Sequence, residues 1–376
     1  KDQNPKLCIA RDKKFVYSET FIDDHITYLS NNLNVVYGQP YPIYISDEKT
    51  IFNKITSHEF HNLTYEDKSK TFDHEFSNYL IQKGIEIVLV EYGTVGAAIY
   101  SACDLAGVPF IVHFHGFDAY NKHILTRLEL EYTRFFKSAA GLITVSKEMY
   151  DKLISLGAPH EKTFLNPYGV SVKRMDLSQP QNSPPWFIAV GRFVEKKAPH
   201  LTIQAFAKTL QHVPQAKLFM VGDGTFLDLC KQTVQDLNIE QSVHFLGVHS
   251  RRSVERLMRM CRAFVQHSIQ ASTGDSEGLP LSVLEAGASG LPVVSTIHAG
   301  IPDAVIENEH GFLVNEGDID SMAEAMTILA KDPYLADKMG KNYRQRIEQH
   351  FSRQLSIDNL KQIISSCHRD LSSKND

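Results

Sequence analysis

Cysteine is scarce in this chain of 376 residues, and its five cysteines are far apart: Cys8, Cys103, Cys230, Cys261 and Cys367. None belongs to a CxxC pair, so the sequence favours neither a disulfide framework nor a structural zinc site, and a reducing compartment fits it better. Long apolar runs are also missing. The longest, 85–90 and 139–145, have the length of strands and fall well short of the ~18 residues that a membrane-spanning helix needs.

Neither sign of charge dominates. Lys and Arg total 39 and Asp and Glu total 44, which gives a formal net charge of −5. This balance argues against a protein that coats nucleic acid. Apolar residues make up 43% and charged residues 22% of the chain, a composition typical of globular proteins. At roughly 150 residues per domain, the length predicts two domains.

In the second half of the chain, short apolar runs alternate with segments of helical period. We expect strands at 186–190, 217–221, 243–246, 263–266, 292–295 and 311–314, and helices at 199–212, 226–237, 253–260, 281–289 and 321–330. Such alternation is typical of a parallel sheet that is covered by helices on both faces.

The first half follows the same pattern less regularly. We expect strands at 7–10, 35–37, 85–90, 110–113 and 142–144, and helices at 21–30, 95–106, 124–137 and 147–156, whereas 38–70 shows no clear pattern. A segment rich in Pro, Ser and Gln at 176–185 is typical of a linker. The sequence therefore predicts an N-terminal α/β domain at 1–178, a second at 179–350, and a C-terminal helix at 351–376 that packs back towards the first.

The segment from Glu277 to Glu285 carries the first chemical signal. Pro280 suits the first turn of a helix that would run on through Glu285. Backbone N–H groups at the start of a helix have no intrahelical partner, so those of Gly278 and Leu279 would bind an anion or a hydroxyl between the two carboxylates. The plainer interpretation is that Glu277 only complements the helix dipole and that Glu285 is solvated.

A cluster of cations follows the strand expected at 186–190. Arg192, Lys196 and Lys197 lie in the loop between this strand and the next helix. Arg binds phosphate oxygens in a bidentate manner, and Lys adds a point charge. The loop is thus a candidate phosphate site, with a solvated basic loop as the alternative.

His113 and His115 end the strand expected at 110–113. Their spacing is that of half a metal site, but no second pair of ligands follows, so we expect no metal here. Alternation along a strand places both rings on one face, and we expect His115 to face the substrate.

Two segments resemble familiar ligand-binding motifs only in part. Gly222-Asp-Gly224 is followed by Leu227 where the dinucleotide fingerprint needs Gly, which disfavours an NAD-dependent oxidoreductase. Asp318 and Asp320 have the DxD spacing of a metal–diphosphate site. However, the run Asp318-Ile-Asp320 directly precedes the helix expected at 321–330, where Asp is a favoured N-cap, so we expect it to cap that helix.

The segment 121–137 combines four cations with Phe135 and Phe136 at helical spacing. It predicts either a helix at a membrane surface or an ordinary amphipathic helix packed on the sheet. Glu129 and Glu131 dilute its positive charge and favour the second.

Together these segments resemble the retaining glycosyltransferases with the GT-B fold, and within them glycosyltransferase family 4. The resemblance rests on the E-x7-E motif at 277–285, the loop at 191–197, and the segments 221–224, 243–247 and 115–118. The runs 274–280, 295–302 and 17–21 are similar to the subgroup that makes bacterial exopolysaccharides of the colanic-acid type. The resemblance implies an α/β fold with two Rossmann-like, doubly wound domains that face each other across a cleft.

The resemblance also implies a role for each matching position. Glu285 would hold the donor ribose, Arg192 and Lys197 would neutralise the diphosphate, and Glu277 and His115 would be catalytic beside the transferring sugar. The other implied site residues are Gly278, Leu279 and Pro280 at the donor sugar and phosphate, Phe245, Gly247 and Val248 at the base, and Glu19 and Asp118 on the acceptor side. Where many family members have a Gly-Gly loop, this chain has Ser18-Glu19-Thr20.

We therefore expect a retaining hexosyltransferase that needs neither metal nor cofactor. It would move a sugar from a UDP- or GDP-sugar to a glycan or lipid-linked acceptor in exopolysaccharide or lipopolysaccharide biosynthesis, and bind no nucleic acid. We expect it in the cytoplasm, with peripheral attachment to the inner membrane. The alternatives are a UDP-sugar 2-epimerase of the same fold and a non-catalytic module that binds sugar nucleotides.

Overall fold

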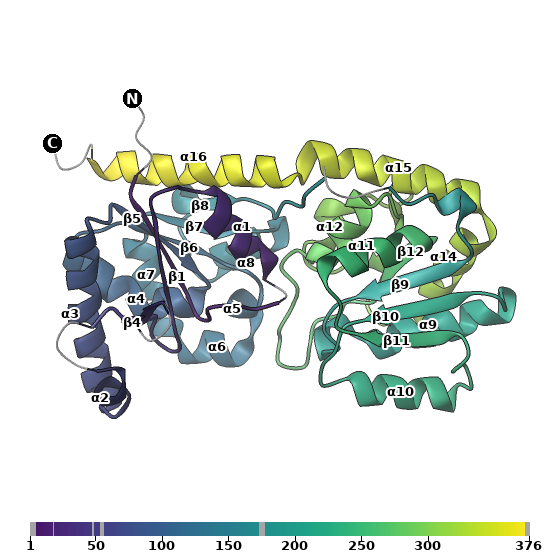
Figure 1. The fold of residues 1–376 in the computed structure, drawn as a ribbon, viewed down its shortest axis with the longest axis horizontal. Coiled ribbons are helices and arrows are strands. Elements are labelled where there is room, and N and C mark those ends of the chain that lie inside the picture. Colours follow the sequence, from purple (N-terminus) through teal and green to yellow (C-terminus); the bar gives the residue numbers. More distant parts are fainter. Residues whose placement is uncertain (1–4, 18, 47–48, 53–55, 173–176, 373–376) are drawn as a thin grey trace. The chain divides into compact units, whose positions relative to one another are not determined.

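The computed structural model describes residues 5–17, 19–46, 49–52, 56–172 and 177–372, and it divides into two compact units. Unit 1 is Lys1–Pro167 with Ser356–Asp376, and unit 2 is Tyr168–Leu355. Figure 1 shows a sheet with helices in each of them. The predicted fold class, α/β with two Rossmann-like units, is confirmed. No helix within the described ranges is both long and apolar enough to cross a bilayer.

Unit 1 has an eight-stranded sheet in the order β4-β3-β2-β1-β5-β6-β7-β8. The strands are β1 (Leu7–Arg11), β2 (Leu33–Tyr37), β3 (Tyr44–Ser46), β4 (Lys49–Thr50), β5 (Ile87–Glu91), β6 (Phe110–His113), β7 (Gly141–Thr144) and β8 (Thr163–Leu165). All neighbours pair in parallel except β2–β3 and β3–β4, which are antiparallel. The carboxyl ends of β1, β5 and β6 therefore meet at one edge of the sheet.

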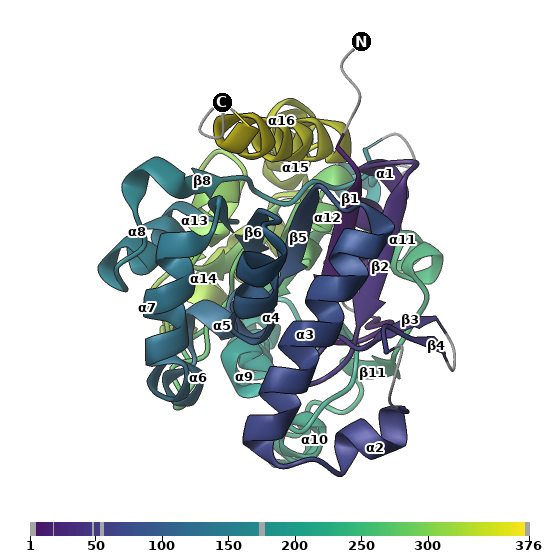
Figure 2. The ribbon, with the colours of Figure 1, turned by 90° about the vertical axis from the view of Figure 1, so that its left-hand side faces the viewer.

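The helices of unit 1 are α1 (Thr20–Tyr28), α2 (Ser57–His61), α3 (Tyr65–Lys83), α4 (Gly93–Ala106), α5 (Phe117–Tyr120), α6 (Lys122–Arg127), α7 (Glu129–Ser138), α8 (Lys147–Ser155), the short η1 (His160–Lys162), and most of α16 (Arg353–Ser372). Helices α3, α4 and α7 lie side by side (Figure 2). The core against α16 joins Leu7, Ile87 and Ile111 of the sheet to Leu360 and Ile364. The last helix of the chain thus completes the core of its first strands.

Unit 2 has a six-stranded, fully parallel sheet in the order β11-β10-β9-β12-β13-β14. The strands are β9 (Trp186–Val190), β10 (Lys217–Val221), β11 (Val243–Gly247), β12 (Ala263–Gln266), β13 (Val293–Thr296) and β14 (Gly311–Val314). The helices are η2 (Pro180–Asn182), η3 (Glu195–Lys197), α9 (Pro199–His212), α10 (Leu227–Asp236), α11 (Arg251–Met260), α12 (Leu281–Ala288), α13 (Ile301–Ala304), α14 (Ile319–Lys331) and α15 (Pro333–His350). In unit 2 every predicted strand and helix is present, within one or two residues at each end.

The unit boundaries fall at 167/168 and 355/356, where the sequence placed them at 178/179 and 350/351. The cause is hydrogen bonding of the connecting segment to unit 2. Val170 N–H donates to the carbonyl of Phe351 at 2.9 Å, and Ser178 N–H donates to the carbonyl of Ser289 at 2.7 Å. The segment that the sequence described as a linker therefore belongs, from Ser178 onward, to the packed body of unit 2.

The helix predicted at 124–137 is interrupted at Leu128, which separates α6 from α7. Phe135 and Phe136 of α7 are 0% and 1% exposed, so the aromatic face of this segment is core. The idea that these rings meet a membrane is wrong, because they already pack under α4. Part of the unassigned region 38–70 forms β3, β4, α2 and the start of α3.

Candidate functional site

The order of strands in unit 2 reverses between β9 and β12, because the chain adds β10 and β11 on one side of β9 and later adds β12 on the other. Ligands of doubly wound sheets bind at such a switch point, beyond the carboxyl ends of the strands. An open pocket lies at this place. Its lining includes Gly191, Arg192 and Lys197 after β9, and Gln266 at the end of β12.

Two glycines let the loops after β9 and β10 approach each other closely. Gly222 has φ +137°, and a Cβ there would lie 1.9 Å from the carbonyl oxygen of Gly191. Gly224 has φ +154°, and its Cβ would lie 2.4 Å from the carbonyl oxygen of Phe193. The Gly-Asp-Gly segment that resembles a dinucleotide fingerprint thus serves the packing that shapes the Arg192 loop.

An ion pair between Lys197 and Glu277 lies at this switch point. The distance from Lys197 Nζ to Glu277 Oε1 is 3.0 Å, and the two side chains are only 14% and 8% exposed. Lys197 Nζ also approaches Gln266 Oε1 at 3.5 Å, and Gln266 Oε1 accepts from the Ser282 hydroxyl of α12. The structure therefore brings together Lys197 and Glu277, which are 80 positions apart in the chain.

The pKa values of this pair fit a carboxylate and an ammonium. Burial raises the pKa of Glu277, but the charges of Lys197 and Lys196 outweigh it and lower that pKa to about 2. Burial lowers the pKa of Lys197, and the Glu277 carboxylate opposes that shift. The Glu277 carboxylate is therefore ionised near neutral pH, and Lys197 is its main counter-ion.

The third cation of the loop has a different partner. Lys196 Nζ lies 3.1 Å from Asp275 Oδ1 and donates to the carbonyl of Ser276 at 3.0 Å. Its side chain is 9% exposed. Lys196 therefore ties the loop after β9 to the segment before Glu277, whereas Arg192 is exposed at the pocket.

His298 and Glu316 hold the backbone at Glu277, and the sequence analysis missed both. The Nε2 atom of His298 accepts from the N–H of Glu277 at 3.2 Å, while its Nδ1 lies 2.6 Å from Glu316 Oε1. These bonds fix the neutral Nδ1–H form of the ring. The conformation of the segment before α12 thus depends on residues that follow β13 and β14.

The other donor residues from the sequence analysis also lie in unit 2. Gly278, Leu279 and Pro280 are buried just before α12. Glu285, on α12, lies 3.7 Å from Arg251 Nε at the start of α11. Phe245, Gly247 and Val248 lie at the carboxyl end of β11, where Gly247 and Val248 are exposed and Phe245 packs edge-on against Phe193.

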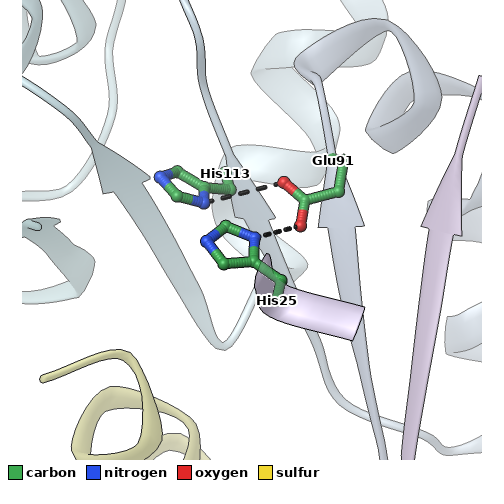
Figure 3. A group of neighbouring side chains, drawn as sticks. All are labelled: His25, Glu91 and His113. Atoms are coloured by element: carbon green, nitrogen blue, oxygen red, sulfur yellow. Dashed lines mark hydrogen bonds and ion pairs between the residues drawn. The ribbon is translucent and has the colours of Figure 1, made fainter. Parts of the chain in front are cut away.

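In unit 1, His115 is held by a buried carboxylate. Its Nε2 lies 2.8 Å from Glu91 Oε2, and the other oxygen of Glu91 lies 2.7 Å from His25 Nδ1. His113 Nδ1 is 3.7 Å from Glu91 (Figure 3). His113 and His115 lie on one face, as predicted, with their ring centroids 4.4 Å apart. The sequence analysis missed His25 and Glu91, because nothing near them in the sequence marks either one.

Asp118 and Glu19, expected on the acceptor side, have partners within unit 1. Asp118 is 0% exposed, and its carboxylate accepts from the N–H groups of Gly93, His115 and Gly116 at 2.7, 3.0 and 3.0 Å. It therefore shapes the His115 loop. Glu19 accepts from the Tyr92 hydroxyl at 2.9 Å. Ser18, beside it, lies outside the described residues.

The predicted helix cap in the run 318–320 is confirmed. The N-cap of α14 is Asp318, because the helix begins at Ile319, two residues earlier than expected. Asp318 Oδ1 accepts from the N–H of Ser321 at 2.9 Å, and its Oδ2 accepts from the hydroxyl of the same residue at 2.7 Å. Asp320 is paired instead with Lys208 of α9. The DxD spacing is thus explained by helix capping and a surface ion pair.

The depressed pKa of Glu277 predicts a specific loss of stability in acid. A carboxylate whose pKa is lower in the folded state stabilises that state above its unfolded pKa, and the stabilisation is lost as the pH falls towards the folded value of about 2. Between pH 5 and pH 3 the native protein should lose about 2 kcal/mol more unfolding free energy than Glu277→Gln, which has no carboxylate to protonate at this position. The chain has one tryptophan, Trp186 on β9, so urea unfolding followed by its fluorescence reports on unit 2. A difference that does not change with pH would contradict an ionised Glu277 paired with Lys197.

Comparison with known proteins agrees with this architecture. The family profile described as Glycosyl transferases group 1 matches residues 175–346, and the one described as Glycosyltransferase Family 4 matches residues 45–174. The chain is 28% identical to the amylovoran biosynthesis glycosyltransferase AmsK of Erwinia amylovora, over 74% of this chain and 70% of that protein. It is also 28% identical to an Escherichia coli UDP-Gal:α-D-GlcNAc-diphosphoundecaprenol α-1,3-galactosyltransferase, over 70% of each.

Among solved structures, Anabaena Alr3699/HepE in complex with UDP superposes with a TM-score of 0.80, at 18% identity, over 96% of this chain and 100% of that one. This likeness shows a shared fold. The two family profiles together span 45–346, which includes every switch-point residue described above. The chain therefore belongs to the glycosyltransferases that these two profiles describe, Glycosyltransferase Family 4 in its N-terminal part and Glycosyl transferases group 1 in its C-terminal part.

Proposed function

We propose that this glycosyltransferase moves a hexose-type sugar from a UDP- or GDP-sugar to a glycan or lipid-linked acceptor, with retention at the anomeric carbon and without a metal ion. The pathway we propose is the synthesis of a cell-surface polysaccharide. The observation that carries the proposal is the Lys197–Glu277 ion pair at the switch point of unit 2, with Arg192 exposed beside it.

The cations fit the diphosphate of such a donor. Phosphoryl oxygens that gain charge as the glycosidic bond breaks need positive groups already in place. Arg192 and Lys197 line the pocket, whereas Lys196 is not among its lining residues and pairs with Asp275. We assign the diphosphate to the two lining cations, which removes the need for a metal there.

The remaining donor groups follow from the layout of unit 2. The exposed end of β11 at Gly247 and Val248 suits the base, and Glu285 beside Arg251 of α11 suits the ribose. Glu277 and the segment up to Pro280 are then the groups nearest the diphosphate, and we assign them to the transferring sugar. We assign His115 to the same sugar on the strength of its family motif.

Names of relatives support the donor and acceptor classes. The Anabaena protein binds UDP, the E. coli relative uses UDP-Gal and a GlcNAc-diphosphoundecaprenol, and the Erwinia relative serves amylovoran biosynthesis. For retention we propose front-face attack. The acceptor oxygen bonds to the anomeric carbon on the face that the diphosphate leaves, and the leaving phosphate oxygen takes the acceptor's proton.

The proposed activity can be tested without knowing the acceptor. Screening UDP- and GDP-sugars by thermal shift identifies the donor, because a bound ligand raises the stability of the folded state. In EDTA, that donor should be slowly hydrolysed to the nucleoside diphosphate and a sugar whose first-formed anomer, read by NMR, matches the donor.

Several results would contradict the proposal. If chelation abolishes turnover and Mg²⁺ or Mn²⁺ restores it, the metal-independent mechanism fails. Formation of an epimeric sugar at C2 would identify a 2-epimerase instead. A thermal shift without any turnover, also when glycan and lipid-linked acceptors are supplied, would indicate a binding module.

The two pocket cations should act on the diphosphate alone. Lys197→Ala and Arg192→Ala should each weaken binding of the nucleoside diphosphate by about 1.5–3 kcal/mol, the scale of charge-assisted hydrogen bonds, with little effect on the nucleoside. Isothermal titration with UDP and uridine, or GDP and guanosine, measures both. Lys208→Ala, which removes a cation on the outer surface of α9, is the matched control. Equal losses for nucleoside and nucleoside diphosphate would mean that these cations do not contact the diphosphate.

The two glutamates of the E-x7-E motif should differ in their kinetic effects. Glu285→Gln should mainly raise the donor KM, since the ribose changes little during the reaction. Glu277→Gln should lower kcat by roughly 10- to 1000-fold, since contacts at the transferring sugar strengthen in the transition state. His115→Ala should resemble Glu277→Gln.

Binding of the nucleoside diphosphate to Glu277→Gln should be kept or strengthened, because the substitution removes the anion that competes for Lys197. Steady-state kinetics and titration of each variant with UDP or GDP provide the measurements. A Glu277→Gln variant with unchanged kcat and raised KM would show that the sugar lies elsewhere.

A further inference from the structure

Glu91 is an ionisable residue with no role in the proposed donor site, and its carboxylate is one of two fully buried ones that contact His115, the other being that of Asp118. Glu91 ends β5, is 0% exposed, and contacts imidazoles from two different elements. Oε1 lies 2.7 Å from Nδ1 of His25 on α1, and Oε2 lies 2.8 Å from Nε2 of His115. Figure 3 shows how His25 and His113 flank this carboxylate.

These contacts determine which nitrogens carry protons. An ionised carboxylate has only acceptor atoms, so each imidazole nitrogen in contact with it must be an N–H donor. Burial raises the pKa of Glu91, but His25 and His115 outweigh it and hold that pKa well below its usual range. His115 is therefore in a form with Nε2 protonated, and in the neutral ring Nδ1 is then the acceptor.

The same surroundings fix the orientation of the His115 ring. Its centroid lies 4.6 Å from that of Phe21 and 4.6 Å from that of Tyr92, which approaches edge-on. The backbone N–H of His115 donates to Asp118 at 3.0 Å. The ring contacts, the backbone hydrogen bond and the hydrogen bond to Glu91 together restrain the His115 ring. Rotation of the ring or a change of its tautomer would break at least one of these contacts.

We propose that Glu91 is a positioning residue for the glycosyl transfer: it holds His115 in the Nε2–H form and orientation that the sugar meets, and His25 holds the second oxygen of Glu91. The inference rests on the proposed role of His115. Glu91 itself does not touch substrate, since its carboxylate is enclosed by protein. It is the counterpart in unit 1 of Glu316, whose carboxylate fixes the tautomer of His298 in unit 2.

A metal ion is the competing interpretation of this cluster. One ligand atom from each of His25, Glu91 and His113 lies within 4.8 Å of the others. Against a metal, the contacts of 2.7 and 2.8 Å are ordinary hydrogen bonds, and each oxygen of Glu91 already has an imidazole partner. The geometry therefore favours hydrogen bonds between Glu91 and the imidazoles over a bound metal ion.

The tautomer of His115 is the first test, and it needs no mutation of Glu91. Long-range ¹H–¹⁵N spectra of protein labelled with ¹⁵N-histidine distinguish a protonated from an unprotonated ring nitrogen, and His115→Asn assigns the signals. We expect a protonated Nε2 on His115. An unprotonated Nε2, or one zinc or other metal ion per chain by elemental analysis, would overturn the inference.

Kinetics of Glu91→Gln are the second test. The amide has one acceptor oxygen and one donor group, so it can satisfy only one of the two imidazoles in their present forms. We expect kcat to fall by roughly 10- to 100-fold, by analogy with the range found when the hydrogen-bond partner of a metal-bound histidine is replaced. Donor KM and nucleoside diphosphate binding should stay near native values, and the His115 or His25 signals should change tautomer. Glu86→Gln, just before the same strand, is the matched control, since this glutamate is exposed.

The outcomes separate this inference from the proposed function. Native kcat in folded Glu91→Gln alongside an impaired His115→Ala would overturn the positioning role alone. Full activity of His115→Ala would overturn the proposed role of His115, and with it the link from Glu91 to catalysis. The spectra would still show whether Glu91 sets the tautomer.

Discussion

The ion pair between Lys197 and Glu277 is the interaction on which the proposed donor site depends. A buried ion pair is costly to desolvate, and removal of one partner leaves an uncompensated charge that is costlier still. The two side chains come from the loop after β9 and from the segment before α12, and only a parallel sheet in the observed order brings these together. Fold and candidate site are therefore coupled, because the ion pair forms only where the sheet holds these two segments side by side.

Imidazole–carboxylate pairs support the reactive segments in each unit. Glu316 orients His298, which accepts from the backbone at Glu277, and Glu91 orients His115. In both cases the carboxylate comes from the end of a strand or the turn after it. The carboxyl ends of parallel strands lie along one edge of the sheet. A side chain at the end of one strand can therefore contact the loop that follows a neighbouring strand.

The sequence was sufficient for much of the fold of unit 2, since its strands are short apolar runs and its helices have clear periods. Motifs in the sequence also marked Arg192, Lys197, Glu277 and Glu285. The structure brings Lys197 and Glu277 together, and the roles of all four towards a donor stay predictions. The sequence analysis missed α3, whose polar sequence buries only a narrow stripe such as Phe72 and Phe76. It missed His25 and Glu91 for a different reason. They are 66 positions apart, and only the pairing of β1 with β5 brings α1 and the end of β5 together.

The charges at the switch point give a physical account of how the proposed site would accept a diphosphate. In the structure Lys197 is neutralised by Glu277 and Lys196 by Asp275, so Arg192, exposed at the pocket, contributes most of the net positive charge there. A diphosphate that reaches Lys197 need not break the ion pair, since an ammonium has three donors. It would add a second anion on the same cation, and Glu277 would then lie beside the phosphate that leaves. A carboxylate in that place repels the diphosphate and stabilises positive charge on the sugar carbon. Both effects favour the separated, oxocarbenium-like transition state over the intact donor.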